Sequence, residues 1–444
     1  MKSDEERAHG DDRECVEEME ATVSAPTAAV VRRTLFRGGV LAALGKRDYR
    51  LLWSGALVSN IGTWIHTTAL LYFVKNLTKS NTWVGAVNLA NFLPVLLFVI
   101  YAGSLADRLN RKKLILVTQA VMLVGALALA VFTTLDMASL GIIIVTTLIM
   151  GVAFAFTFPA WQAILPDLVS GEDLLNGIAL SAAQFNLARF VGPGLGALII
   201  SVWSVSTAFY FNAVSFLAVM GAIMLIRTKT PPYPHPAEGT RKHMMEGLRH
   251  VWTNRWALNI LIVLAITAFF GLPYIVLMPA VAIDVLHAGR SGFGVLLAFS
   301  GLGAVIGAPL ITYLSRYLKE RELIKLATTA LGLFLIGFSL SRVYWLSVML
   351  SVGLGCSYLM LSSAINTVLQ SRVSRDIRGR VMSFYILMLI GVFPFGGLAM
   401  GAIADVRSAP FALFLGGGAC LLLATVLTAV PGITRDAVSA GVRS

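Results

Sequence analysis

Residues 103–112 read Gly103-Ser-Leu-Ala-Asp107-Arg108-Leu-Asn-Arg111-Lys112. This short charged stretch separates two apolar runs, 83–105 and 114–134. Each run has about the 20 residues that a membrane-spanning helix needs. Gly103 permits the close approach of another helix, and Asp107 can meet the positive N-terminal end of a helix. The stretch is therefore expected to be a tight loop at a membrane surface.

The whole chain has the composition of a membrane protein. Of its 444 residues, 57% are hydrophobic and only 13% are charged, and its mean hydropathy is +0.79. Soluble domains contain about 25% charged residues, so this composition disfavours a soluble enzyme. It equally disfavours a nucleic-acid-binding protein, although the net charge is +12. Three widely spaced cysteines do not form a disulfide framework.

Hydropathy predicts an all-α polytopic protein with twelve transmembrane helices, because these stretches are apolar on all sides. The spans are expected at 51–74, 83–105, 114–134, 139–160, 177–201, 207–227, 257–280, 291–314, 323–341, 344–367, 381–403 and 411–430.

The basic residues alternate between the two sides of this arrangement. Loops on the side of the N-terminus hold 26 Lys and Arg residues, and the opposite loops hold 5. Basic loops of membrane proteins remain in the cytoplasm, so we expect both termini to be cytoplasmic in a bacterial inner (plasma) membrane. The basic excess is thus an orientation signal, and a nucleic-acid partner is unnecessary.

The chain is expected to divide into two six-helix halves joined by a linker. Nine of the 23 acidic residues lie in the first twenty positions, which indicates a disordered tail and not a secretory signal. The longest loop follows the sixth span and is rich in proline. The predicted segments are an acidic then basic tail 1–43, a half 44–227, a linker 228–256, a half 257–430 and a tail 431–444.

The stretch at 103–112 matches the G-x-L-A-D-R-x-x-R-[RK] signature and so resembles the major facilitator superfamily. The resemblance implies two pseudo-symmetric six-helix halves around a central cavity. It also implies that Gly103, Asp107, Arg108 and Arg111 form a conformational latch for one state of an alternating-access cycle. The alternative is an ordinary basic loop. The matching place in the second half, 308–316, has no such aspartate, so the latch is degenerate there.

Further motifs resemble one branch of that superfamily, the enterobactin-exporter-like or transmembrane secretion effector branch, which is also similar to macrolide efflux carriers. The resemblance covers about 44–430 and does not specify the substrate. The motifs are Asn60-Ile-Gly-Thr-Trp64, Leu77-Thr-Lys-Ser80, Phe158-Pro-Ala-Trp-Gln162, Leu165-Pro-Asp-Leu-Val169, Phe185-Asn-Leu-Ala-Arg-Phe-Val-Gly-Pro193, Asp284-Val-Leu286 and Arg378-Gly-Arg-Val-Met382.

The fifth span contains Gly192-Pro193-Gly-Leu-Gly196, which resembles the core of the antiporter motif of drug-exporting facilitators. Glycine permits helix contact, and proline bends a helix and frees a carbonyl group. Plain helix packing is the alternative role for these residues, because pairs of small residues four apart recur elsewhere in the chain.

Arg189 is the one basic residue that lies inside a predicted span. A central arginine costs at least about 2.5 kcal/mol on insertion scales, so its side chain should face a cavity or a partner. It could recognise an anionic or polar substrate, or act in a gate. It could equally pair with carbonyl groups freed by Pro193 or with a neighbouring helix.

No Asp or Glu lies in the middle of a span, and His66 is the single mid-span histidine. Its intrinsic pKa suits proton coupling, although such a histidine is more often hydrogen-bonded to a neighbour. The first, fourth, seventh and tenth spans line the cavity in the family's fold. This favours His66, Tyr274, Tyr358 and Asn366 as cavity residues, with helix-to-helix bonding as the alternative. Pro94, Pro273, Pro279 and Pro394 are expected to kink their spans.

The sequence therefore predicts a secondary active transporter that works by alternating access. We expect it to export a small amphipathic organic molecule, such as a siderophore, a macrolide or another drug, coupled to an ion gradient, with the proton as the expected ion. Uptake of a nutrient or a lysophospholipid is the alternative within transport, and a non-transporting receptor or scaffold is the alternative outside it. We expect a monomer without enzyme activity, metal or cofactor, and no Walker A motif indicates use of ATP.

Overall fold

The computed structural model describes residues 41–429 except 170, 172, 231–253 and 374. The predicted tail 431–444, the predicted tail 1–43 except its last three residues, and most of the predicted linker 228–256 lie outside the described residues. The first half of the chain forms a short helix and six long ones. They are η1 (Ala42–Gly45), α3 (Arg47–Thr78), α4 (Asn81–Arg108), α5 (Arg111–Thr134), α6 (Leu140–Leu168), α7 (Asp173–Val202) and α8 (Val205–Leu225).

The second half also forms six membrane-length segments, two of which are interrupted by π-helical turns. The seventh segment is α10 (Arg255–Ile266), η2 (Thr267–Gly271), α11 (Tyr274–Ala280) and η3 (Val281–Val285). The others are α12 (Gly289–Leu314), α13 (Glu320–Leu340), α14 (Tyr344–Arg372), the eleventh segment of α15 (Arg375–Ile386), η4 (Leu387–Gly391) and α16 (Phe393–Val406), and α17 (Ala409–Ala429).

Short polar residues fix where several helices begin. The side chains of Ser80, Asn110, Ser139 and Ser204 each accept a hydrogen bond from a backbone N–H in the first turn of α4, α5, α6 and α8. Such caps satisfy donors that the helix itself leaves unpaired. The connections between successive helices are consequently short, and the chain alternates between the two ends of the bundle.

The predicted all-α architecture is confirmed. Eleven helical segments of the described chain are long and apolar enough to cross a membrane. The twelfth, α3, has a membrane-spanning length of 32 residues but is absent from that group. Its polar residues include Ser59, His66 and Thr68, all buried inside the bundle. The helices extend a few residues beyond most of the predicted spans.

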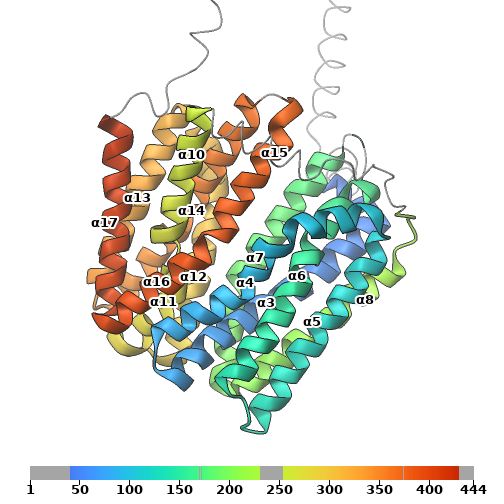
Figure 1. Ribbon diagram of the computed structural model, residues 1–444, viewed down its shortest axis with the longest axis horizontal. Helices are drawn as coiled ribbons and strands as arrows, with labels where there is room; N and C mark the ends of the chain where they lie inside the picture. Colours follow the sequence, from blue (N-terminus) through green and yellow to red (C-terminus); the bar gives the residue numbers. More distant parts are fainter. Residues whose placement is uncertain (1–40, 170, 172, 231–253, 374, 430–444) are drawn as a thin grey trace, which may run out of the picture.

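The two groups of six helices stand side by side (Figure 1). α4 packs along α16, and α7 packs along α12, so these four helices join the halves. We call the end where α4 finishes and α5 begins the basic end, because it carries Lys46, Arg108, Lys112 and Lys319. The end where α3 finishes and α4 begins is the opposite end. In Figure 1 the two halves diverge toward the basic end, at the top of the view.

Candidate functional site

Arg189 lies in the middle of α7, sixteen residues after the start of this 30-residue helix. Its guanidinium carbon lies 5.8 Å from the centre of the Trp64 ring of α3, which is a cation–π distance. Among the described residues, the guanidinium group makes no hydrogen bond or ion pair. The structure therefore places this cation against an aromatic ring and gives it no carboxylate or freed carbonyl partner.

α12 holds Arg189 close to the second half of the protein. Gly301 lies so close to the carbonyl oxygen of Arg189 that a Cβ atom would overlap it, and Gly355 of α14 lies equally close to the carbonyl of Ser300. Ser300 also hydrogen-bonds Tyr274 of α11 through their hydroxyl groups at 2.7 Å. One turn of α12 thus fixes the spacing of α7, α11 and α14.

Tyr358 lies one turn after Gly355 and is buried. The charge of Arg189 and the phenols of Tyr274 and Tyr385 act on it electrostatically, so these four side chains form one cluster. The Tyr358 hydroxyl is buried and has no hydrogen-bond partner among the described residues. Three of the predicted cavity residues, Arg189, Tyr274 and Tyr358, therefore meet where the two halves face each other.

Asn366 lies two turns along α14 from Tyr358, toward the basic end. Its side-chain oxygen accepts a hydrogen bond from Gln370 at 2.6 Å, and it is hydrogen-bonded to Tyr385. Tyr385 also donates to the carbonyl of Ser362 at 3.2 Å. Asn366 is thus linked to the tyrosine cluster through Tyr385 of α15.

His66 lies apart from this cluster. Its ring packs against Phe209 of α8, with the ring centres 4.8 Å apart. It is buried, and its Nδ1 atom has no hydrogen-bond partner among the described residues. His66 therefore faces the interior of the first half and not the surface between the halves.

The Gly192-Pro193-Gly-Leu-Gly196 motif packs on both of its sides. Gly192 lies against Trp64, and Gly196 lies against Ile65, so both glycines bring α7 close to α3. On the other side, the carbonyl of Pro193 and the side chain of Ala197 press on Gly294 of α12. The motif thus packs tightly against the second half one turn after Arg189, between the arginine and the opposite end of the molecule.

One face of α7 is exposed from the basic end down to Arg189. Leu175 is 78% exposed, Ile178 49% and Phe185 48%, and they follow one another at helical spacing. Arg189 itself is half-buried, and the next turn, at Pro193, is buried. The exposed face therefore ends at the arginine, directly before the tight packing against α12.

The predicted latch residues have separate surroundings. Gly103 has nothing within 4 Å of an added Cβ, so the expected close helix approach is not made in this conformation, because the halves diverge here. Arg108 is exposed. Arg111 is buried and forms an ion pair with Asp167 at 2.5 Å. The side chain of Asp107 lies outside the described residues.

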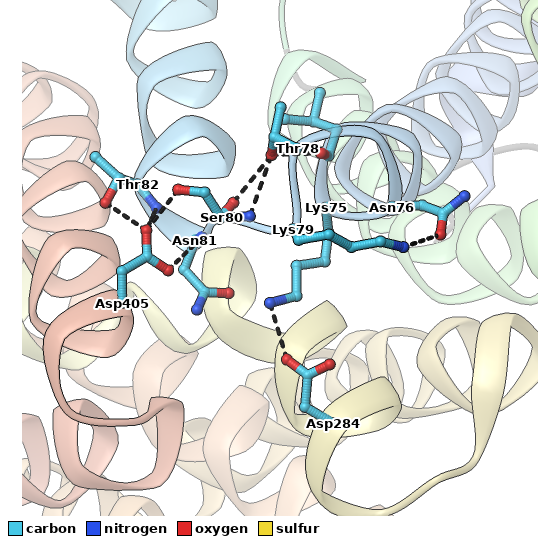
Figure 2. Close-up of polar contacts among 10 residues, drawn as sticks. Lys75, Asn76, Thr78, Lys79, Ser80, Asn81, Thr82, Asp284 and Asp405 are labelled. Carbon is cyan, nitrogen blue, oxygen red and sulfur yellow. Dashed lines mark hydrogen bonds and ion pairs between the residues drawn. The ribbon is translucent and has the colours of Figure 1, made fainter.

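At the opposite end, Asp405 of the second half caps the first turn of α4 in the first half (Figure 2). Its carboxylate accepts hydrogen bonds from the backbone N–H groups of Asn81 and Thr82 at 2.7 and 2.9 Å, and from the Thr82 hydroxyl at 2.6 Å. The Ser80 hydroxyl donates a fourth. A carboxylate at a helix N-terminus is favoured by both the free N–H groups and the helix dipole.

A second link lies beside this cap. The ammonium group of Lys75 is 2.8 Å from the carboxylate of Asp284, which comes from the second half (Figure 2). The Lys75 side chain is 7% exposed, whereas that of Asp284 is 52% exposed. We call the two links together the clasp. It comprises Lys75, Ser80, Asn81, Thr82, Asp284 and Asp405.

Sequence reasoning missed several residues of these sites. Tyr385, Ser300 and Trp64 carry no individual signal, because each is an ordinary side chain until α12 and α15 are placed. Trp64, Ser80 and Asp284 did stand in the quoted branch motifs, but without a role. Asp405 could have been found as an acidic residue two positions after the end of the predicted span 381–403.

Comparison with known proteins gives the family. Residues 38–438 match the family described as transmembrane secretion effector. The chain belongs to this family of major facilitator transporters. Its relatives include the staphyloferrin A transporter of Staphylococcus aureus, which is 23% identical over 80% of this chain and 89% of the relative. Macrolide efflux protein A of Streptococcus pyogenes is 23% identical over 88% and 97%. The multidrug efflux pump Tap of Mycolicibacterium fortuitum is 26% identical over 80% and 88%.

Solved transporters have the same fold as this family member. The nucleoside transporter NupG matches with a TM-score of 0.70 at 13% identity, over 86% of this chain and 98% of that one. A POT family transporter in complex with 5-aminolevulinic acid matches with a TM-score of 0.71 at 13% identity, over 88% and 97%. The major facilitator prediction is thus confirmed. This transmembrane secretion effector is a multi-pass membrane transporter of small molecules and not an enzyme.

Proposed function

We propose that this protein is an exporter that works by alternating access, with one substrate site between its halves. The observation that carries the proposal is the exposed face of α7, which leads from the basic end to Arg189 and ends there. The clasp closes the other end of the molecule. A transporter that is open at one end and closed at the other has the form that alternating access requires of each of its end states.

The basic end is proposed to lie in the cytoplasm. The 26 basic residues of the loops on this side, against 5 on the other, support this orientation. The conformation described here is then open toward the cytoplasm, which is the state in which an exporter takes up its substrate. Opening of the clasp would release the substrate on the outside.

The cargo is proposed to be a small amphipathic organic molecule, such as a siderophore, a macrolide or another drug. The names of the staphyloferrin A, macrolide and multidrug transporters among the relatives support this class. The composition of the central cluster supports it as well. Trp64 and the exposed Phe185 offer apolar rings, and Arg189 offers a charge.

Export is proposed to be coupled to an ion gradient, with the proton as the ion and the monomer as the working unit. His66 supports the choice of ion, because its Nδ1 atom has no hydrogen-bond partner among the described residues and is available to take up a proton. Histidine is the side chain whose ordinary pKa allows protonation near neutral pH.

Oriented membrane vesicles test the direction of transport. Inverted vesicles energised with a proton gradient should accumulate the exported drug or siderophore, and a proton uncoupler should abolish the accumulation. An efflux-deficient host grown on a panel of antibiotics and siderophores identifies the compound to use. Flux in right-side-out vesicles only, with a nutrient or a lysophospholipid, would contradict export and establish uptake.

The latch role of Asp107 has its own test. Asp107→Ala should reduce the transport rate with little loss of membrane insertion. An unchanged rate, at equal amounts of protein in the membrane, would refute that role.

A further inference from the structure

We propose that the central site binds an organic anion, whose negative group is held between Arg189 of the first half and Tyr358 of the second. This inference rests on the proposed transport function and names the chemical class of the substrate. It begins from Arg189, which makes no hydrogen bond or ion pair within the described part of the chain. An arginine at mid-membrane depth is costly unless a partner or water compensates its charge. A ligand anion would supply the missing partner.

The second half provides a matching donor. The buried Tyr358 hydroxyl has no partner among the described residues, although buried polar groups are nearly always hydrogen-bonded. Arg189 and Tyr358 stand on helices that pack on the same turn of α12, because Gly301 lies against the backbone of Arg189 and Ser300 lies against Gly355, one turn before Tyr358. The charge of Arg189 also acts on this phenol, so the two donors belong to one region between the halves. Tyr274 lacks this freedom because Ser300 occupies its hydroxyl group. A carboxylate or a similar oxyanion can accept from both free donors at once.

Aromatic rings define the other part of the ligand. Trp64 lies beneath the guanidinium group, and Phe185 meets Trp64 edge-on with ring centres 6.3 Å apart. Phe185 is also on the exposed face of α7 that leads from the basic end. The site therefore offers an apolar surface next to the charge, which fits an anion carrying a flat or apolar body.

Two matched probes test the charge requirement. Naphthoic acid and naphthamide have the same ring system, but only the acid is negatively charged at neutral pH. We would measure their binding by calorimetry to the full-length protein in nanodiscs of phosphatidylcholine. The acid should bind about tenfold more tightly than the amide. An affinity ratio of this size corresponds to the free energy that a hydrogen bond to a charged group contributes. Equal affinities, or no binding of the acid, would overturn the inference.

Variants assign the preference to the two donors. Arg189→Gln should abolish the preference for the acid, and Arg189→Lys should retain part of it. Tyr358→Phe removes only the hydroxyl group. It should therefore weaken the binding of the acid severalfold and leave the binding of the amide unchanged. Tyr210→Phe is the matched control and should change neither affinity, because the Tyr210 hydroxyl of α8 lies against Thr134 within the first half, away from the site. A preference that survives Arg189→Gln would refute the assignment.

The anion could come from a free substrate or from a lipid headgroup. Repeating the titration in phosphatidylglycerol nanodiscs distinguishes these sources. An anionic headgroup in the site would compete with the acid and lower its affinity for the wild type, but not its affinity for Arg189→Gln. Transport is measured separately in inverted vesicles. Export without a preference for the acid would refute this inference alone, and a preference without export would refute the proposed function alone.

A separate observation leads to a second inference, which concerns how the two ends of the protein alternate. The sequence Gly103-Ser-Leu-Ala-Asp107 at the end of α4 has a counterpart in Gly401-Ala-Ile-Ala-Asp405 at the end of α16. The two helices run antiparallel, since Gly85 lies against Gly397 and Phe92 against Phe393. The same short motif therefore stands at opposite ends of one helix pair.

The copy at the opposite end shows what the motif does when it is engaged. Gly401 lies against the backbone of Asn81 so closely that a Cβ would overlap it, and this approach allows Asp405 to cap α4. At the basic end, no atom of the described residues lies within 4 Å of a Cβ added to Gly103. The family resemblance already implies a latch at Asp107. We infer that Asp405 is its counterpart at the opposite end, so that the Asp405 cap on α4 holds the present state, in opposition to the latch at Asp107.

Distances between spin labels test this inference in a cysteine-free background. One pair, at Lys113 and Lys319, reports on the basic end, and another, at Met137 and Arg290, reports on the opposite end. Asp405→Asn should shift the population about fivefold toward the state that is closed at the basic end. Asp107→Asn should shift it in the other direction. The exposed loop residue Asp136 supplies the control, Asp136→Asn, which should shift neither distance.

Two outcomes would overturn the reciprocal arrangement. Either the two variants shift the population in the same direction, or Asp405→Asn leaves both distance distributions unchanged. Membrane insertion and thermal stability of both variants are measured in parallel, and Ser80→Ala is a milder second variant that removes one of the four hydrogen bonds to Asp405. It should produce a smaller shift in the same direction as Asp405→Asn.

Discussion

Arg108 and Arg111 belong to the same short loop, but only one of them is structural in the conformation described. Arg111 is 1% exposed and paired with Asp167, whereas Arg108 is exposed. Removing one partner of a buried ion pair leaves an uncompensated charge, which destabilises a protein by about 3–5 kcal/mol. Arg111→Gln should therefore lower the thermal stability of the purified protein strongly, and Arg108→Gln should leave it nearly unchanged. Equal melting temperatures would contradict the structural role of Arg111.

His66 leads to a prediction about proton movement. If its imidazole takes up the transported proton, His66→Gln should abolish the proton flux that accompanies substrate transport, while substrate binding persists. A pH-sensitive dye inside proteoliposomes measures the proton flux. His287 is exposed in a loop at the opposite end, so His287→Asn is the control and should transport protons as the wild type does. Full proton flux in His66→Gln would exclude His66 from the coupling.

The individual residues of the site were predictable only where they violate a general rule. Arg189 is recognisable because a charged residue inside a membrane helix is rare, and Tyr358 and Tyr274 follow from the family's cavity-lining spans. Trp64 and Tyr385 violate no rule, because aromatic residues are common in any span. Their proximity depends on the glycine contacts of α12, which no single stretch of sequence encodes.

At the scale of elements, hydropathy located the membrane segments well but not their internal form. The helix ends extend past several predicted spans, because capped first turns and polar last turns continue the helix outside the apolar run. The π-helical turns η2, η3 and η4 were not predicted as such. η2 ends two residues before Pro273 and η4 ends three residues before Pro394, and proline interrupts the regular hydrogen bonding of a helix.

Glycines of the α3–α7 contact provide a test at this scale. A Cβ on Gly192 would overlap the Trp64 side chain and lie 3.1 Å from the carbonyl oxygen of Ile61. Gly192→Ala should therefore destabilise the first half by about 1–3 kcal/mol, as overpacking does. Gly221 of α8 has nothing within 4 Å of an added Cβ, so Gly221→Ala should be neutral or stabilising by up to about 1 kcal/mol. Thermal unfolding in detergent compares the two, and equal effects would contradict the packing role.

At the scale of the whole molecule, the clasp determines which end is open. Lys75→Asp should weaken the closed end, because it places two acids together where an ion pair with Asp284 stood. The double variant Lys75→Asp with Asp284→Lys should restore closure. Labelling of a cysteine introduced near the opposite end by an impermeant reagent measures opening in intact cells. If the double variant remained as reactive as the single one, the ion pair would have no part in closure.

The arrangement of the two halves could be predicted from the family resemblance, but the conformation could not. The basic loops and the motif at 103–112 indicate the topology, since both depend on local sequence. Which end is closed depends on contacts between residues more than 200 positions apart, such as Lys75 with Asp284 and Ser80 with Asp405. The sequence contains both partners of each contact without indicating that they meet.

The polar character of α3 has a consequence for biogenesis. α3 is the first long helix of the described chain, yet it is missing from the group that is apolar enough to span a membrane by itself. Insertion by the translocon favours apolar segments, so α3 needs protein neighbours to shield its polar side. Those neighbours, α7 and α8, are synthesised about a hundred or more residues later. We therefore expect α3 to reach a stable position in the bilayer only after most of the first half has been synthesised.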